Sequence, residues 1–515
     1  MVKVRIHIFS QYNEKSVALA EDITAVYEEK TKFEELSDIT KPDEGEELSL
    51  YLIKNNEQEN IKDAVILTNK YKGYTDIALD LFIFSTIPGS AAIIDSLDKG
   101  NIKIHLVDPN ETAAYNLLYE HPMFADADTH GSEELTVLIV GSGKMAETCL
   151  KAVLWCGRMK SRRLKLHFIG PDADKTEMKL KLYNPGLFDQ EVQSNQNMKE
   201  LGLIKSDIYS FLKLTRMKFY KADTDSQEFE IQINNALMAD YIIVDCGDDF
   251  KTLETARYIR AHFIRKHIVC PEYRIGGRIP VVKLPAIYPH IKDAVLSSVI
   301  QVLKAEGQEP IPGDDEMDLR PFGSIAYVFS AKNIIDWEID KLAAAMFPPE
   351  SDPRQTESAR RAHRASAVHT IYKLRDINFI ENPGEGNYDE REYKPVRKAF
   401  INEELENRKY ELAALEHQRW NIFMLTEGWI PADSYCALIY GKLNEDGKRE
   451  HRQYAGKMNA ALIETSALSN VAGKLKGSVS YFTEFDRNLV VSLFEKLSSI
   501  RPDFKMLWMP VAEPD

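Results

Sequence analysis

Short runs with period-two and period-3.6 apolar spacing alternate along residues 1–130. Val2, Val4, Ile6 and Ile8 fall at period two, which is typical of one face of a strand, and residues 15–30 then switch to a helical stripe. Alternating strand and helix patterns favour a parallel, doubly wound α/β domain over residues 1–130. Its further predicted strands are Leu48–Ile53, Ala64–Thr68, Ile77–Ser85 and Ile102–Val107.

The same alternation of strand and helix patterns repeats over residues 131–305. Leu135–Val140 is a continuous apolar run, as expected of a strand buried on both faces. The pattern therefore predicts a second Rossmann-like doubly wound unit. Its other expected elements are strands at Leu164–Ile169, Met217–Tyr220, Tyr241–Val244 and Ile268–Cys270, and helices at Leu253–Phe263 and Ala286–Ala305.

Residues 306–334 are polar and rich in Pro and Gly, which predicts a linker. The remaining residues, 335–515, have mostly helical spacing and predict a third, mainly α-helical domain. The expected helices are Ile335–Met346, Glu357–Leu374, Glu403–Gly428, Ala460–Ser469 and Asp486–Ser499.

Composition narrows the class of protein. The chain has 515 residues with 65 Lys plus Arg and 80 Asp plus Glu, so the net charge of −15 argues against binding duplex nucleic acid over a broad face. No apolar run is long enough to predict a membrane span, and the first residues lack the features of a signal peptide. Five cysteines without a CxxC pair indicate neither a disulfide framework nor a zinc ribbon. We expect a cytoplasmic protein.

A glycine-rich turn follows the strand at Leu135–Val140. Its sequence is Gly141-Ser142-Gly143-Lys144-Met145-Ala146, the GxGxxA pattern of a dinucleotide-binding turn. In such a turn the first glycine permits the bend, the second lets a pyrophosphate approach, and the alanine allows close packing of helix on strand. The helix N-terminus then offers N–H groups to the phosphates. These residues predict binding of NAD or a related adenine nucleotide, and the alternative is a turn kept for structural reasons.

Acidic residues near two strand ends complete this predicted site. Gly170 stands where an acid that binds ribose is expected, and Asp172 follows two residues later. Asp245 closes the predicted fourth strand, at the edge where ligands lie in such sheets. Asp248 or Asp249 is expected to cap the next helix. The predicted cofactor-binding residues are Gly141, Ser142, Gly143, Lys144, Ala146, Asp172 and Asp245.

The two segments VLIVGSGKMAETCLKAVLWCG and ADYIIVDCGDDFKTLETARYIR resemble the NAD-binding domain of potassium-transport regulators, the TrkA-N type. The resemblance covers residues 131–275. It implies a domain that binds a nucleotide as a ligand rather than reacting it. Because the acid expected after the second strand is missing, ADP-ribose, an adenine nucleotide and an empty site are alternatives to NAD.

Residues 411–430 predict a helix that carries charged and aromatic side chains close together. Glu416, Trp420 and Phe423 share one face, and Arg419 lies three residues from Glu416 and can pair with it. Gly428 is a plausible helix C-cap, after which Trp429 could fold back on the helix. Two interpretations remain open: an Arg–Glu pair that locks a helix hairpin, or a pocket in which aromatic rings stack a base and Arg419 holds a phosphate or carboxylate.

Several short motifs here resemble the bacterial ryanodine-receptor-type (RyR) domain. They are Leu412-Ala413, Glu416-His417, Arg419-Trp420, Gly428-Trp429, Lys457-x-Asn459, Leu462-Ile463 and Phe485-Asp486-Arg487, preceded by Arg364, Ser366, His369 and Lys373-Leu374. The resemblance covers residues 335–500, although Asn459, Ala460 and Glu464 replace the usual His, Asn and Pro. It implies a ligand site made of Glu416, Arg419, Trp420, Trp429, Lys457, Asn459 and Arg487.

Catalytic signatures are absent from the sequence. There is no HExxH, GxSxG or kinase motif, and the twelve histidines show no metal-ligand spacing, so we predict no catalytic residue and no metal site.

The combination of domains resembles bacterial TrkA-N/RyR proteins. That resemblance implies a sensor or regulator of a nucleotide-derived signal, with a role in antiviral (phage) defence and with a second copy or an effector protein as partner. The alternatives are an NAD(P)-dependent oxidoreductase and a non-catalytic scaffold with vestigial sites.

Overall fold

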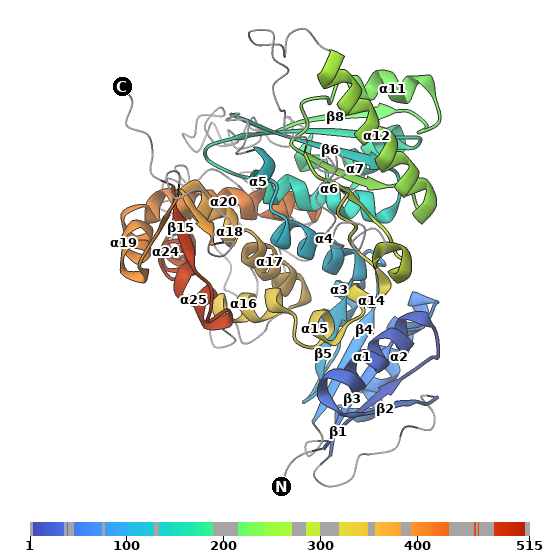
Figure 1. Ribbon diagram of the computed structural model, residues 1–515. Helices are drawn as coiled ribbons and strands as arrows, with labels where there is room; N and C mark the ends of the chain where they lie inside the picture. The colour runs from blue at the N-terminus through green and yellow to red at the C-terminus, as the bar shows by residue number, and fades with distance from the viewer. Residues whose placement is uncertain are drawn as a thin grey trace. The chain divides into compact units, whose positions relative to one another are not determined.

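The computed structural model describes residues 4–35, 39, 46–74, 78–127, 133–188, 215–269, 285–298, 319–348, 356–382, 393–431, 458–459, 462 and 478–509 (Figure 1). The chain forms two compact units, each assembled from separate segments. The first unit comprises Met1–Leu117, His290–Gly307 and Pro321–Arg364, and the second comprises Leu118–Pro289, Gln308–Arg320 and Ala365–Asp515.

The first unit is built on a five-stranded parallel sheet. Its strands are β1 (Val4–Phe9), β2 (Lys30–Phe33), β3 (Glu46–Leu52), β4 (Leu79–Phe84) and β5 (Lys103–Val107). Their order is β2-β1-β3-β4-β5, the doubly wound order 2-1-3-4-5. Helices α1 (Glu14–Tyr27), α2 (Glu57–Tyr71), α3 (Ser90–Asp95) and α4 (Pro109–Glu120) connect or follow these strands. The predicted α/β architecture is confirmed here.

Two of the local expectations for this unit are wrong. The strand predicted at Ala64–Thr68 lies inside α2, where Ala64 and Leu67 pack into the apolar core as one face of a helix. Short apolar runs cannot distinguish a strand from a buried helical segment. The edge strand β2 was not predicted, because its sequence, KTKF, has a single large apolar residue.

The two faces of the first sheet differ in chemistry. Residues such as Ile8, Leu50 and Leu81 form an aliphatic core with α2 and α3. On the other face, aromatic rings stack from strand to strand: Phe9 on Tyr51 at 4.6 Å, and Tyr51 on Phe82 at 4.8 Å between ring centroids. The alternation of side chains along each strand produces this division.

Short helices from later in the chain complete the first unit. They are α14 (Ile325–Val328), α15 (Ala331–Ile334), α16 (Glu338–Met346) and the first residues of α17 (Glu357–Val368). The Trp337 indole donates to Asn116 Oδ1 at 2.7 Å, and the Asn116 amide donates to Asn333 at 3.1 Å, which fixes α15 and α16 against α4. Helices α14 and α15 fall within residues 306–334, and the predicted domain boundaries stay a prediction.

The second unit contains another five-stranded parallel sheet. Its strands are β6 (Glu134–Gly141), β7 (Arg163–Gly170), β8 (Thr215–Lys221), β9 (Tyr241–Asp245) and β10 (Ile287–Pro289), in the order β10-β9-β6-β7-β8. Counted along the chain this is the Rossmann order 3-2-1-4-5. The main helices between the strands are α6 (Lys144–Cys156), α7 (Ala173–Tyr183), α11 (Gln227–Asn234) and α12 (Asp249–Val269). The strand order reverses between β6 and β9, where Gly141 pairs with Asp245.

The fifth strand of this sheet was predicted in the wrong place. Ile268 and Val269 end the long helix α12, and Cys270 lies outside the described residues. The strand is instead Ile287–Pro289, at the start of the range expected to be helical. Both stretches are short and apolar, so their pattern does not distinguish the two states.

Helices dominate the rest of the second unit. They include α18 (Thr370–Asp376), α19 (Lys398–Asn407), α20 (Lys409–Thr426), α24 (Ser478–Val491) and α25 (Leu493–Ile500), beside a small antiparallel sheet of β11 (Phe379–Glu381), β15 (Met506–Trp508) and β12 (Lys394–Pro395). Helix α20 is central and packs against α6, α18 and α24. The helix predicted at Ala460–Ser469 lies outside the described residues.

Within the described ranges, no helix combines the length and the apolar character that a membrane crossing requires. The same residues contain no group of three or more His, Cys, Asp or Glu side chains arranged to hold a metal ion.

Candidate functional site

The glycine turn lies where the prediction placed it, between β6 and α6 at the switch point of the second sheet. Gly141 is the last residue of β6 and has a φ of 134°, a conformation that L side chains rarely adopt. Gly143 precedes the first residue of α6 and Lys144 begins it. Ser142 and Gly143 are partly exposed and Lys144 is exposed, so the turn is accessible from solvent.

The carboxylate of Asp245 occupies the N-terminus of α6. Ala146 N–H donates to Asp245 Oδ2 at 3.1 Å, and Gly247 N–H approaches Oδ1 at 3.4 Å. A Cβ atom built on Gly143 would stand only 2.7 Å from Oδ2. The space that a small residue at 143 leaves for a pyrophosphate is therefore filled by this chain's own carboxylate.

Two other glycines are explained by backbone packing. A Cβ on Gly141 would lie 1.8 Å from the carbonyl oxygen of Asp245, and a Cβ on Gly170 would lie 2.3 Å from the carbonyl oxygen of Gly141. Gly170 thus allows the ends of β6 and β7 to approach closely, which is why no acid stands there. Asp172, the predicted substitute for that acid, pairs with Lys175 at 2.5 Å on the surface.

The helix after β9 begins as expected. Asp248 Oδ1 accepts the backbone N–H of Lys251 at 2.9 Å, which confirms that Asp248 caps α12. Asp245, at the start of the same DCGDD segment (Asp245–Asp249), instead bonds to the first turn of α6.

A second cluster surrounds Glu416 on α20. Arg419 Nη2 donates to Glu416 Oε1 at 2.8 Å, which confirms the predicted pair. Lys373 Nζ of α18 lies 2.6 Å from Oε2, and Ser366 Oγ donates to Oε1 at 2.8 Å. Glu416, Arg419 and Lys373 are 3%, 1% and 0% exposed, so the network is closed off from solvent. Arg419 Nη1 and His369 Nδ1 have no hydrogen-bond partner within the described residues.

The charges of this network shift one another's proton affinity. Burial alone would raise the pKa of Glu416, but the adjacent Arg419 and Lys373 hold that pKa well below its ordinary value. Burial lowers the pKa of Lys373, and Glu416 offsets part of that effect. Burial followed by the charge of Lys373 lowers the pKa of His369 far below its ordinary value, so this imidazole is neutral.

The network lies against the C-terminal end of α6. His369 Nε2 donates a hydrogen bond at 2.7 Å to the carbonyl oxygen of Arg158, two residues after α6 ends. Phe423 of α20 meets Trp155 of α6 edge to face, with ring centroids 6.3 Å apart. Cys156, the last residue of α6, is buried beside Tyr372. One helix therefore has the glycine turn at its start and the buried network at its end.

The other predicted RyR-type residues that the structure describes lie on or beside α20, and Asn459 of β14 pairs with Pro431 of β13 (Ile430–Pro431), two residues after Trp429. Trp420 is half-buried and stacks on His417, whose Nδ1 lies 3.5 Å from Asp486 Oδ2. Arg487 stacks on the exposed Tyr410 ring at 4.5 Å. Trp429 follows Gly428, which adopts the left-handed conformation expected of a C-cap. Asn459 lies in β14 (Met458–Asn459), and Lys457 lies outside the described residues.

Sequence reasoning placed Lys373 and Ser366 in the RyR-type resemblance without assigning them to the site. Both come from helices earlier in the chain than α20, so helical spacing could not connect them to Glu416. The single available signal was chemical: a carboxylate on a buried helix face requires cationic or hydrogen-bonding partners.

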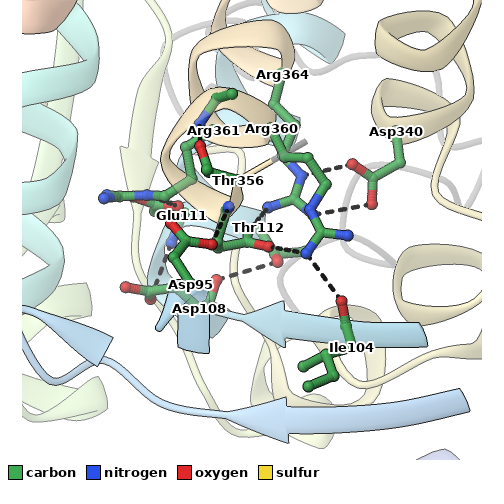
Figure 2. Close-up of polar contacts among 12 residues, drawn as sticks. Asp95, Ile104, Asp108, Glu111, Thr112, Asp340, Thr356, Arg360, Arg361 and Arg364 are labelled. Atoms are coloured by element: carbon green, nitrogen blue, oxygen red, sulfur yellow. Dashed lines mark hydrogen bonds and ion pairs between the residues drawn. The ribbon is translucent and has the colours of Figure 1, made fainter. Parts of the chain in front are cut away.

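A third polar cluster lies in the first unit, where no site was predicted (Figure 2). Arg361 Nε of α17 donates to both carboxylate oxygens of Glu111 at 2.9 and 3.1 Å. Arg364 Nη1 lies 2.9 Å from Glu357, and Arg360 Nη2 donates to the carbonyl oxygen of Ile104 on β5 at 2.9 Å. These contacts join α17 to α4 and the edge of the sheet, which is a structural role.

Asp108 stands beside this cluster and caps α4. Its Oδ1 accepts the backbone N–H of Asn110 at 2.9 Å. Burial raises the pKa of Asp108 to about 7 because it disfavours the charged carboxylate, and the negative charge of the neighbouring Glu111 adds to this effect.

Comparisons of the chain with protein-family models, with curated proteins and with solved structures find no match.

Proposed function

We propose that this protein is a non-catalytic sensor or regulator that binds a nucleotide or nucleotide-derived molecule in its second unit, and that the helical part of this unit is an RyR-type domain. The observation that carries the proposal is the position of α6. Its first residue follows an accessible glycine turn at a topological switch point, and its last turn packs against the buried Glu416 network.

Helix α6 supplies a physical connection for sensing. A ligand shifts a conformational equilibrium only as far as it binds one state better than another. A molecule held at residues 142–144 contacts the start of α6, and any displacement of α6 changes the packing of Trp155 against Phe423. Because the interior is close-packed, such a displacement is passed to α20 rather than absorbed locally.

The proposal is tested by thermal denaturation with NAD, NADP, ADP-ribose and its cyclic forms, ATP and cyclic oligonucleotides. A ligand at about 100 times its Kd stabilises the folded protein by about 2.7 kcal/mol, which shifts the midpoint by several degrees. Lys144→Glu reverses an exposed charge at the turn and should reduce the shift. The matched change Lys218→Glu, on the exposed β8 edge, should leave it intact.

A second candidate function is a non-catalytic scaffold. The observation that favours it is the internal explanation for all three glycines, because Gly141, Gly143 and Gly170 each make room for other atoms of this chain. A panel that gives no midpoint shift with any member would support the scaffold over the sensor.

A further inference from the structure

Strand β2 forms one edge of the parallel sheet in the first unit. Among the described residues it pairs with β1 alone, and its side chains Lys30, Lys32 and Phe33 are exposed. At the opposite edge, Arg360 Nη2 already binds the carbonyl oxygen of Ile104 on β5. An edge strand offers its outward N–H and C=O groups to a further strand unless something covers them. Of the two edges, β2 is therefore the one at which we expect such an addition.

The backbone of this segment shows which residues face outward. Glu34 N–H, directly after β2, donates to the carbonyl oxygen of Phe9 at 3.2 Å, so the backbone of Glu34 faces β1. Successive residues of a strand direct their hydrogen-bonding groups to opposite sides. The N–H and C=O groups of Phe33 and Thr31 therefore point away from β1, toward the position of an added strand.

Two exposed aromatic rings lie beside these outward groups. Phe33 is 39% exposed, and Tyr12, in the loop between β1 and α1, is 75% exposed. The two rings meet edge to face with centroids 5.1 Å apart, and Phe33 also contacts the buried Phe9 at 5.4 Å. Aromatic side chains are enriched at protein–protein interfaces, and aromatic pairs across neighbouring strands stabilise a sheet. A strand added to β2 would thus cover an aromatic surface as well as bind the backbone.

The charges of this segment are complementary to themselves. Residues 30–35 read KTKFEE, with the cations before Phe33 and the anions after it. When two such segments lie antiparallel with their Phe33 residues opposite each other, Lys32 is opposite Glu34 of the second copy, and Thr31 is opposite Glu35 of the second copy. Two-fold symmetry makes each of these pairs occur twice. Lysines on an edge strand discourage pairing with most strands, and the glutamates that follow them make an exception for a second copy.

We propose that two copies of this chain associate through β2, by antiparallel pairing of their edge strands into one continuous sheet. The two Phe33 rings then lie opposite each other on one face of that sheet, and each has its own Tyr12 beside it. The association is weak, because the strand is short and buries a small area. It does not depend on any ligand of the second unit.

Sedimentation velocity of the 515-residue chain, from micromolar to submillimolar concentration, tests the charge pattern. The wild type should form a dimer that dissociates on dilution. Lys32→Glu should weaken this dimer roughly tenfold, because it places like charges opposite each other twice. Glu34→Lys should weaken it similarly. The double variant Lys32→Glu/Glu34→Lys restores both opposite-charge pairs and should recover the wild-type dissociation constant.

A second pair of variants tests the aromatic contact. Phe33→Asp replaces two facing rings by two facing carboxylates and should prevent dimer formation. Phe250→Asp is the matched control, because it removes a ring that is 72% exposed in the second unit, and it should leave the dissociation constant unchanged.

Three results would overturn the inference. They are a wild type that stays monomeric throughout the concentration range, a dimer that Lys32→Glu leaves unchanged, and a double variant that associates no better than the single ones. Lys32 is exposed and Glu34 is half-buried, so these charge changes keep the test decisive even if Phe33→Asp fails to fold.

Discussion

Lys373 Nζ lies 2.6 Å from Glu416 Oε2, and neither side chain is exposed to solvent. The two residues come from different helices, α18 and α20, so their contact fixes the packing of one helix on the other. Arg419 contributes a second cation to the same carboxylate. The Glu416 carboxylate therefore forms ion pairs with both buried cations.

Glu416→Gln should destabilise the protein strongly. The amide removes the carboxylate that Lys373 and Arg419 both contact directly, and breaking a buried ion pair in this way costs about 3–5 kcal/mol. Urea denaturation at neutral pH measures the difference. Exposed Glu403→Gln on α19 is the matched control and should change the free energy of unfolding by less than about 0.5 kcal/mol.

The same substitution has a predicted pH dependence. The pKa of Glu416 lies below its ordinary 4.5 in the folded protein, so its stabilising effect is present above that value and is lost as the pH falls through the folded pKa. The stability difference between wild type and Glu416→Gln should therefore narrow in acid. A difference that stays constant from neutral pH into acid would show that the charge of Glu416 does not stabilise the network.

Gly170→Ala should destabilise the second unit. The new Cβ would stand 2.3 Å from the carbonyl oxygen of Gly141, and backbone atoms cannot move aside cheaply. We expect a loss of roughly 1–3 kcal/mol, as for other overpacked positions. Gly73→Ala is the control, because a Cβ there meets nothing within 4 Å. If both variants unfold at the same urea concentration, close packing at Gly170 is not what the turn requires.

The sequence predicts contacts between residues that are close together in the chain. It does not predict contacts between residues that are far apart in it. Helical spacing was enough to pair Glu416 with Arg419, since the two residues are three apart on one helix. Lys373 could not be placed beside them, because residue spacing shows which residues share a face of one helix and does not show that α18 packs on α20. The doubly wound architecture followed from alternating periods, whereas the fifth strand did not, because a three-residue strand has too few positions to show one.

The glycine turn shows the same limit. Its pattern predicted the strand, the bend and the helix, and all three are present. The pattern could not show that Asp245, about 100 residues later, fills the space above Gly143. That contact depends on β9 lying next to β6 at the reversal of strand order.

Asp108→Asn should stabilise the first unit at alkaline pH. The folded protein holds the Asp108 proton up to about pH 7, whereas the unfolded chain releases it near the ordinary value of 3.8. The folded state thus binds more protons between these values, and wild-type stability falls as the pH rises through this window. Asparagine can still accept the Asn110 N–H without the charge.

We expect the variant to be more stable than the wild type by about 4 kcal/mol at pH 8 and equal to it at pH 3.5. Denaturation curves at the two pH values measure this. A variant that is less stable at both would show that the carboxylate is needed in its charged form.

The wild type should lose stability in mild acid because of His167, and His167→Phe should not show this loss. Burial, with Lys165 and Lys218 nearby, lowers the pKa of His167 from 6.5 to about 4. The unfolded chain takes up the proton first, so wild-type stability is complete above 6.5 and is lost as the pH falls toward 4. Phenylalanine keeps a ring to stack on Tyr220 and does not titrate.

Between pH 7 and pH 4 the wild type should lose about 3 kcal/mol more than His167→Phe. Thermal or urea denaturation across this range gives the comparison. Parallel pH profiles for the two proteins would contradict the assigned titration.

The most direct test of the account is hydrogen exchange of α6 and α20 in the 515-residue chain, with and without millimolar adenosine or ADP-ribose. The account predicts slower amide exchange at the start of α6, residues 144–149, together with slower exchange across residues 409–426 of α20. This result would show that a ligand at the turn reaches the buried Glu416 network. Unchanged exchange in both helices with either compound would contradict the sensor, and slowing confined to α6 would contradict the connection through it.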